Sequence, residues 1–334
     1  SAVVIDAAGN SSQAGSGSAT LDTTAPSAPT VTITEDTNND GYISASELDG
    51  DIDVRIDLPN DAAVGDTLRV TNPDGTTTDY PVDQNMIDNG LALSYPVSDF
   101  PQGQERTVSA VVIDAAGNSS QAGSGSATLD TTAPSAPTVT ITEDTNNDGY
   151  ISASELDGDI DVRIDLPNDA AVGDTLRVTN PDGTTTDYPV DQNMIDNGLA
   201  LSYPVGDFPE GQVTTISAVV IDAAGNSSQA GSGSATLDTT APSAPTVTIT
   251  EDTNNDGYIS ASELDGDIDV RIDLPNDAAV GDTLRVTNPD GTTTDYPVDQ
   301  NMIDNGLALS YPVSDFPQGQ ERTVSAVVID AAGN

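Results

Sequence analysis

The sequence predicts an all-β protein made of tandem β-sandwich domains, and three observations support this fold class. A block of 108 residues repeats along the 334-residue chain, so that Asp6, Asp114, Asp222 and Asp330 all stand in the same string, Ile-Asp-Ala-Ala-Gly-Asn. Within the block, apolar and polar residues alternate with a period of two, which is typical of half-buried strands. Turn sequences rich in Gly, Pro, Asn and Asp separate these segments. A period of this length is too long for one turn of a solenoid and has the usual size of an independent domain.

The repeat boundaries divide the chain into four parts. We expect residues 1–25 to be the C-terminal part of a preceding repeat and residues 242–334 to be a repeat that lacks its last strand. Residues 26–133 and 134–241 are complete repeats. Between these two, Pro134 and Pro137 restrict their own backbone and that of the preceding residues, so the linker is expected to be short, extended and stiff.

Each complete repeat contains seven strand candidates. The clearest is 51–58, where Ile52, Val54, Ile56 and Leu58 are expected to point inward and the intervening charged residues outward. A short helix is expected around 83–88. Seven antiparallel strands in about 100 residues are typical of an immunoglobulin-like sandwich, although the usual Cys and Trp markers are missing and leave the topology open. In the first complete repeat the candidates are 30–34, 51–58, 66–71, 76–82, 91–97, 106–113 and 123–129.

The charge balance excludes several classes of partner. The chain has 55 acidic residues and 8 basic ones, all Arg, and a formal net charge of -47. Binding to nucleic acid or to anionic membranes depends on Lys and Arg, so neither is expected. No apolar run is long enough to span a membrane. Because this much charge repels itself in a compact state, divalent cations or high salt must neutralise it.

A twelve-residue acidic loop occurs once in each repeat. Residues 36–47 match the calcium-loop pattern D-x-[DN]-x-[DN]-G-x5-E, with Gly41 at the sharp turn. The expected Ca2+ ligands are three side chains, one backbone carbonyl, a Ser that acts through water and a bidentate Glu. Because strands rather than helices flank the loop, a calcium-switching EF-hand sensor is disfavoured; an acidic turn that binds nothing is the other alternative. The predicted ligands are Asp36, Asn38, Asp40, Tyr42, Ser44 and Glu47; Asp144, Asn146, Asp148, Tyr150, Ser152 and Glu155; and Asp252, Asn254, Asp256, Tyr258, Ser260 and Glu263.

A second group of calcium ligands is expected where one repeat meets the next. In immunoglobulin order, alternate loops lie at opposite poles, so the end of the last strand of one repeat faces the second-strand loop and the Asp-Ala-Ala-Gly-Asn turn of the following repeat. Repulsion among these acidic groups favours a shared cation; the alternative is a set of ordinary polar turns. The candidate residues are Asp22, Asp114, Asn118, Asp130, Asp165, Asp169, Asp174, Asp222, Asn226, Asp238 and Asp330.

Four strings give the chain a family resemblance: Val-Val-Ile-Asp-Ala-Ala-Gly-Asn-Ser, Leu-Asp-Thr-Thr-Ala-Pro, Glu-Asp-Thr-Asn-Asn-Asp-Gly-Tyr-Ile and Asn-Asp-Ala-Ala-Val-Gly-Asp-Thr. Together they resemble the extender repeats of giant RTX adhesins of Gram-negative bacteria, above all those of marine species that bind ice or surfaces. The resemblance implies tandem calcium-bound immunoglobulin-like domains. It also implies a location at the cell surface, type I secretion, and a ligand-binding tip in other domains of the parent protein.

The sequence bears on three other functions. An enzyme is disfavoured because the chain has no His or Cys, and its carboxylates are better explained as metal ligands. A glycan- or ice-binding module has little support beyond the hydroxyl cluster at 76–78. An acidic surface-layer or matrix repeat of a halophile remains an alternative, because acidity without Lys suits high salt as well as calcium. The partners expected for this segment are neighbouring repeats of the same chain.

Overall fold

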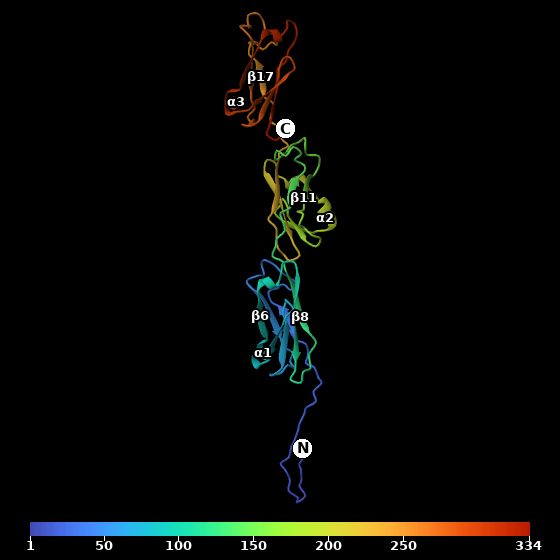
Figure 1. The fold of residues 1–334 in the computed structure, drawn as a ribbon. Helices are drawn as coiled ribbons and strands as arrows, with labels where there is room; N and C mark the ends of the chain where they lie inside the picture. Colours follow the sequence, from blue (N-terminus) through green and yellow to red (C-terminus); the bar gives the residue numbers. More distant parts are fainter. The chain divides into compact units, whose positions relative to one another are not determined.

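A computed structural model describes all 334 residues, and the chain divides into two compact units (Figure 1). The first unit contains Ser1–Ala133 together with Asp222–Asn226, and the second contains Pro134–Ile221 together with Ser227–Asn334. The predicted all-β class is confirmed, because strands make up nearly all the regular structure. The helical elements are α1 (Gln84–Asn89), α2 (Gln192–Asn197), α3 (Gln300–Asn305) and three 3-10 turns, Val97–Asp99, Val205–Asp207 and Val313–Asp315.

In the first unit, residues 26–133 form two sheets that pack around one core. The three-stranded sheet has the order β1-β3-β6 and the five-stranded sheet has the order β2-β8-β7-β4-β5. All neighbours are antiparallel except β2, which runs parallel to β8. The strands are β1 (Thr30–Ile33), β2 (Tyr42–Ile43), β3 (Ile52–Asp57), β4 (Thr67–Thr71), β5 (Thr77–Pro81), β6 (Leu91–Tyr95), β7 (Glu105–Ile113) and β8 (Gly123–Leu129).

The second unit repeats this plan and then repeats part of it. Residues 138–237 form the sheets β14-β11-β9 and β10-β16-β15-β12-β13. Their strands are β9 (Thr138–Ile141), β10 (Tyr150–Ile151), β11 (Ile160–Asp165), β12 (Thr175–Thr179), β13 (Thr185–Pro189), β14 (Leu199–Tyr203), β15 (Val213–Ile221) and β16 (Gly231–Leu237).

The third copy has two three-stranded sheets, β17-β18-β21 and β20-β19-β22, with no counterpart of β2 or β8. Without that neighbour its last strand is also shorter, five residues against the nine of β7. At the other end of the chain, residues 1–25 contain only two isolated antiparallel bridges. The strands of the third copy are β17 (Thr246–Ile249), β18 (Ile268–Asp273), β19 (Thr283–Thr287), β20 (Thr293–Pro297), β21 (Leu307–Tyr311) and β22 (Ser325–Ile329).

The seven expected strands are all present, and the alternation that predicted them is visible in the burial of β3. Ile52, Val54 and Ile56 are buried, whereas Asp53 and Arg55 are exposed. The helix expected around 83–88 is α1, whose first turn is capped by the side chain of Asp83. The strand that the sequence reading missed is β2, which lies inside the twelve-residue loop. The loop therefore does more than join two strands, because two of its own residues pair with β8.

The glycines of β8 let the two sheets approach along one edge. A Cβ atom at Gly125 would lie 2.9 Å from the backbone oxygen of Val31 on β1, and one at Gly123 would collide with the backbone oxygen of Pro29. Only glycine leaves room for this contact. β8 therefore supports both β1, which leads into the loop, and β2, which lies within it. None of the helices is long and apolar enough to cross a lipid bilayer.

Candidate calcium loops and junction turns

The twelve-residue loop of the first repeat is held together by its own acidic side chains. Asp36 is buried; one of its carboxylate oxygens accepts from the Asp40 N–H at 3.1 Å and the other from the Gly41 N–H at 3.0 Å. Asp40 in turn accepts from the Tyr42 N–H at 2.8 Å. The backbone at Asn39 has a φ of 58° and that at Gly41 a φ of 90°, which brings these groups around a tight turn.

Glu47 closes the loop from its far end. Its Oε1 accepts from the N–H and hydroxyl of Thr37 and from the Asn38 N–H, while its Oε2 accepts from the N–H and hydroxyl of Ser44. Burial acts to raise the pKa of Glu47, but the hydrogen bonds from Ser44, Thr37 and Asn38 outweigh it and lower the pKa. The carboxylate is therefore ionised at neutral pH and ties loop position 12 to positions 2, 3 and 9.

Pairing between β2 and β8 engages two carbonyls of the loop and leaves the one between them, that of Tyr42, free of β8. The Gly41 oxygen accepts from the Thr128 N–H at 2.9 Å, and the Ile43 oxygen accepts from the Asp130 N–H at 3.0 Å. Successive carbonyls of an extended segment point in opposite directions, so the Tyr42 carbonyl between them is directed away from β8. Tyr42 occupies loop position 7, where a calcium loop supplies a backbone carbonyl.

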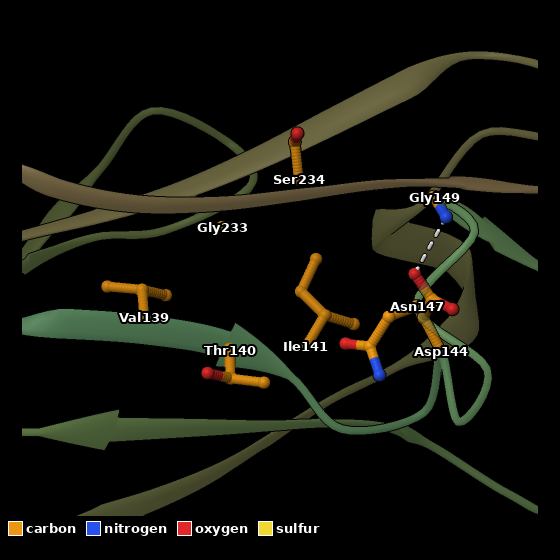
Figure 2. A pocket seen from close by; sticks show the side chains of 8 residues that line it. All are labelled: Val139, Thr140, Ile141, Asp144, Asn147, Gly149, Gly233 and Ser234. Atoms are coloured by element: carbon orange, nitrogen blue, oxygen red, sulfur yellow. Dashed lines mark hydrogen bonds between the residues drawn. The ribbon is translucent and has the colours of Figure 1, made fainter.

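The loop of the second repeat has the same geometry. Figure 2 shows the Asp144 carboxylate accepting from the Gly149 N–H, a bond of 2.9 Å, with Asn147 beside it and Gly233 and Ser234 of β16 opposite. Glu155 makes the same bonds as Glu47, and its pKa is lowered in the same way. The donor set is carboxylate, amide, hydroxyl and carbonyl oxygen, which suits a hard cation such as Ca2+ and not a thiophilic metal.

The Asp-Ala-Ala-Gly-Asn turn connects the two longest strands of each complete repeat. In the first repeat, one oxygen of Asp114 accepts from the N–H groups of Ala116 and Asn118, and the other accepts from the Asn118 amide at 2.8 Å. These hydrogen bonds lower the pKa of Asp114, with the Asn118 amide as the largest cause. The carboxylate is thus engaged inside its own turn.

The residues predicted for the junctions fall into two groups. In the second unit, burial raises the pKa of Asp238 and the charges of Asp330, Glu210 and Asp282 raise it further, while a hydrogen bond from the Thr240 N–H acts to lower it; these carboxylates form no group arranged to hold a metal ion. Asp130 and Asp238 directly follow β8 and β16, and Asp22 is their repeat counterpart. The backbone carbonyl of each accepts from the Asn of a turn: Asn118 for Asp22, Asn226 for Asp130 and Asn334 for Asp238.

The other predicted residues have protein partners. Asp165 pairs with Arg163 at 2.7 Å, Asp169 accepts from the N–H and hydroxyl of Ser135, and Asp174 accepts from the Ala171 N–H. The sequence reading missed Asp282 and Glu210. Asp282 could have been found as the repeat counterpart of Asp174. Glu210 carries a different signal, because the first and third copies have Gln at that position.

Comparison with known proteins gives two kinds of match. A family model described as an EF hand matches residues 36–53, 144–161 and 252–269, one segment in each copy. A structure of a Ca2+-stabilised adhesin from an Antarctic bacterium is 32% identical over 99% of this chain and 77% of that chain, with a TM-score of 0.40. Among curated proteins, no significant match was found.

Two further structures come from ice-binding adhesins. One, from a 1.5-MDa bacterial adhesin, is 26% identical over 93% of this chain and 95% of that chain, with a TM-score of 0.36. The other, an immunoglobulin-like domain of the M. primoryensis adhesin, is 31% identical over 31% of this chain and 99% of that chain, with a TM-score of 0.23. Identity above 30% along almost the whole chain decides the family.

The chain belongs to the extender repeats of large bacterial adhesins. It is therefore a structural segment of a cell-surface adhesin, and its three acidic loops are calcium-binding loops of the EF-hand type placed in a β-sandwich.

Proposed function

We propose that this segment is a calcium-stiffened extender that holds a ligand-binding tip away from the cell. One observation carries the proposal most directly: in both complete repeats the acidic loop pairs through β2 or β10 with the strand that leads out of the repeat. An ion bound in the loop thus acts next to the linker. The role of each residue in metal binding, and the division into domains at 26–133, 134–241 and 242–334, are parts of the same proposal.

Each loop would hold its ion through residues of its own. Asp36, Asn38 and Asp40 supply side-chain oxygens, the Tyr42 carbonyl is directed away from β8, and Glu47 already bridges the two ends of the loop. Ser44 would act through water. Bound Ca2+ supplies positive charge and a shell of six to eight oxygen ligands. Hydrogen bonds from Thr37, Asn38 and Ser44 to Glu47 support the proposal, because they already tie the last position of the loop to its first half and to Ser44.

The junction is the second proposed site. Burial raises the pKa of Asp238, and the charges of Asp330, Glu210 and Asp282 raise it by smaller amounts; a cation beside these carboxylates would favour the ionised form. Their counterparts at the preceding junction are Asp130, Asp222, Asp174 and the uncharged Gln102.

Charge makes folding itself depend on calcium in this proposal. Residues 26–133 carry 18 acidic residues and 3 Arg, a net charge of -15. The three Arg of that repeat neutralise few of them; Arg55 pairs with Asp57 and Arg69 with Asp79 at the surface. Ligand at about 100 times its dissociation constant adds roughly 2.7 kcal/mol per site, a large part of the stability of a small domain.

The remaining parts of the proposal concern the parent protein. The tip and the C-terminal signal for type I secretion would lie in other regions, as in the family that this chain resembles. Sedimentation velocity of the full 334-residue chain at fixed ionic strength tests the mechanical role. Calcium should lower the sedimentation coefficient relative to chelator by extending a folded chain, and the same concentration of Mg2+ should do so much less. Equal coefficients in all three buffers would contradict the proposal.

A further inference from the structure

The Asp-Ala-Ala-Gly-Asn turn occurs four times with identical sequence but different surroundings. Its internal bonds are shared, because in every copy the first Asp accepts from the backbone N–H of the Asn. Burial is not shared: the second alanine is 2% exposed at Ala224 and Ala332 but exposed at Ala8 and Ala116. The four turns are Asp6–Asn10, Asp114–Asn118, Asp222–Asn226 and Asp330–Asn334.

The contacts of the final Asn explain this difference in burial. In the first unit, the side-chain amide of Asn226 donates to the Asp130 carbonyl and its oxygen accepts from the Ala45 N–H, both at 2.9 Å. In the second unit, Asn334 makes the same pair of bonds, at 2.7 Å to the Asp238 carbonyl and 2.8 Å from the Ala153 N–H.

The other two Asn residues make fewer contacts outside their own turns. Outside its own turn, Asn118 reaches only the Asp22 carbonyl, at 3.3 Å, because residues 1–25 contain no acidic loop. Asn10 is exposed and bonds only within its own turn. The turn is therefore buried where, and only where, the chain contains the acidic loop of the repeat before it. Its sequence alone does not bury it.

The N–H that Asn226 contacts is one that the acidic loop positions. Ala45 directly follows Ser44, whose N–H and hydroxyl both donate to the Oε2 of Glu47. The carbonyl that Asn226 contacts belongs to Asp130, whose own N–H donates to Ile43 of the loop. One amide thus joins two segments that are already tied to the same loop.

We propose that Asn226 and Asn334 are docking residues, which fasten each turn to the acidic loop of the preceding repeat and so couple occupation of that loop to the order of the junction. The docking follows from the hydrogen bonds, and only the coupling to calcium rests on the proposed function. Both ends of the amide are engaged by protein groups, so the docking role leaves any junction ion to the neighbouring carboxylates. This differs from a ligand role for Asn226, and the two roles respond oppositely to Asn226→Asp.

Asn226→Asp keeps the size of the side chain, removes the N–H donor and places a negative charge beside the Asp130 carbonyl and the Asp222 carboxylate. A docking residue fails on this change, whereas a cation ligand keeps or improves its binding. Asn226→Ala removes both bonds. Asn10→Ala is the matched control, because it alters the same turn where the Asn side chain bonds only to Asp6 of that turn.

The readout is the distance between spin labels in the full chain at saturating calcium. The chain has no Cys, so cysteines introduced at the exposed strand positions Thr77, Thr185 and Thr293 can be labelled in pairs. The 77/185 pair spans the junction that Asn226 serves. The 185/293 pair spans the next junction and reports whether the repeats stay folded in the same variant.

We expect both Asn226 variants to lose the single narrow distance peak of the 77/185 pair while the 185/293 peak and the Asn10→Ala chain stay unchanged. Glu47→Gln should broaden the 77/185 peak as well, whereas Glu263→Gln in the third loop should broaden neither. A narrow 77/185 peak in Asn226→Asp would overturn docking in favour of a ligand role, and a narrow peak in Asn226→Ala would overturn both. If Asn226→Ala broadens the 77/185 peak but Glu47→Gln does not, the coupling to calcium is refuted and the docking stands. The extender function is tested separately, by the sedimentation experiment.

Discussion

The second and third acidic loops have the same twelve residues and lie in the same unit, yet their surroundings differ. Around the first Asp of the loop the hydrogen bonds agree: Gly149 and Gly257 donate to it at 2.9 and 2.8 Å. The exposure of the loop residues differs: Ser152 is 2% exposed and Tyr150 half-buried, whereas Ser260 is exposed and Tyr258 is 78% exposed. The turn is thus made locally, and its burial is supplied by other parts of the chain.

Two supports of the second loop are missing from the third. β16 pairs with β10, and the Asn334 oxygen accepts from the Ala153 N–H. The third copy has no counterpart of either within the chain. Because an ion shell is stronger when its oxygens are held in place beforehand, the complete repeats should bind calcium more tightly than the third copy. The following changes test this difference in calcium binding between the complete repeats and the third copy.

Removal of calcium should give the largest effect. In chelator each repeat keeps its charge without the neutralising ions, so the melting temperature should fall by tens of degrees, and most for the two complete repeats. Differential scanning calorimetry at constant ionic strength measures this. Identical melting temperatures with calcium and chelator would show that salt alone stabilises the chain, as in a halophilic matrix protein.

Glu155→Gln and Glu263→Gln make a matched pair in the second unit. Each removes one charge at loop position 12, and Glu155 also holds Ser152 through two hydrogen bonds. We expect Glu155→Gln to weaken a tight site by about a hundredfold, ~2.7 kcal/mol, and Glu263→Gln to remove a site that is weaker from the start. Calorimetric titration of the full chain distinguishes the two. If the sites lost in the two variants have the same calcium affinity, burial of the loop does not set that affinity.

Gly125→Ala should make the first repeat resemble the third copy. The added Cβ lies 2.9 Å from the Val31 oxygen, so β1 and β8 must separate, at a cost of roughly 1–3 kcal/mol. The control is Gly17→Ala, the same position in residues 1–25, where nothing lies within 4 Å. Urea unfolding measures the cost. A chain as stable as the control would mean that the β1–β8 contact does not support the loop.

The smallest expected effect on stability comes from Tyr203, and it depends on pH. Burial, with smaller contributions from Tyr188, Asp182 and Asp207, raises its pKa to about 12, and its hydroxyl donates to Asn180 at 3.0 Å. Unfolded tyrosine ionises near pH 10, so the stability that this neutral phenol contributes is present below about pH 10 and is lost between about 10 and 12.

Tyr203→Phe should cost about 1 kcal/mol at neutral pH and should reduce the loss of stability over that alkaline range. Alkaline unfolding curves of the two chains, compared with tyrosinate absorbance, measure both quantities. Parallel curves across the alkaline range would rule out the buried phenol as the cause.

Much of the fold could be predicted because its signals are local. Alternation over Ile52–Leu58 predicts β3, and the short helix expected around 83–88 is α1. The spacing from Asp36 to Glu47 predicts an acidic loop of this length. The strand β2 could not be found in this way, because two residues show no periodicity and they pair with a strand at 123–129.

The contacts of the candidate junction site depend on longer separations. The sequence placed Asp130 and Asn226 at facing poles, but not the bond between Asn226 and Ala45, which lie 181 residues apart. It also did not indicate that Asp165 pairs with Arg163, although a period of two puts both side chains on one face of the strand. Such pairings are decided by packing between elements, which a single sequence leaves undetermined.

Small-angle scattering of arrays with two, three and four complete repeats tests most directly whether calcium makes this segment a stiff extender. At constant ionic strength in calcium, the maximum dimension should grow linearly with the number of repeats, by about 40 to 50 Å for each, given strands of about seven residues plus loops and linker. In chelator it should grow more slowly. If the two series coincide, calcium does not lock the junctions, and any stiffness must come from the proline-containing linker alone.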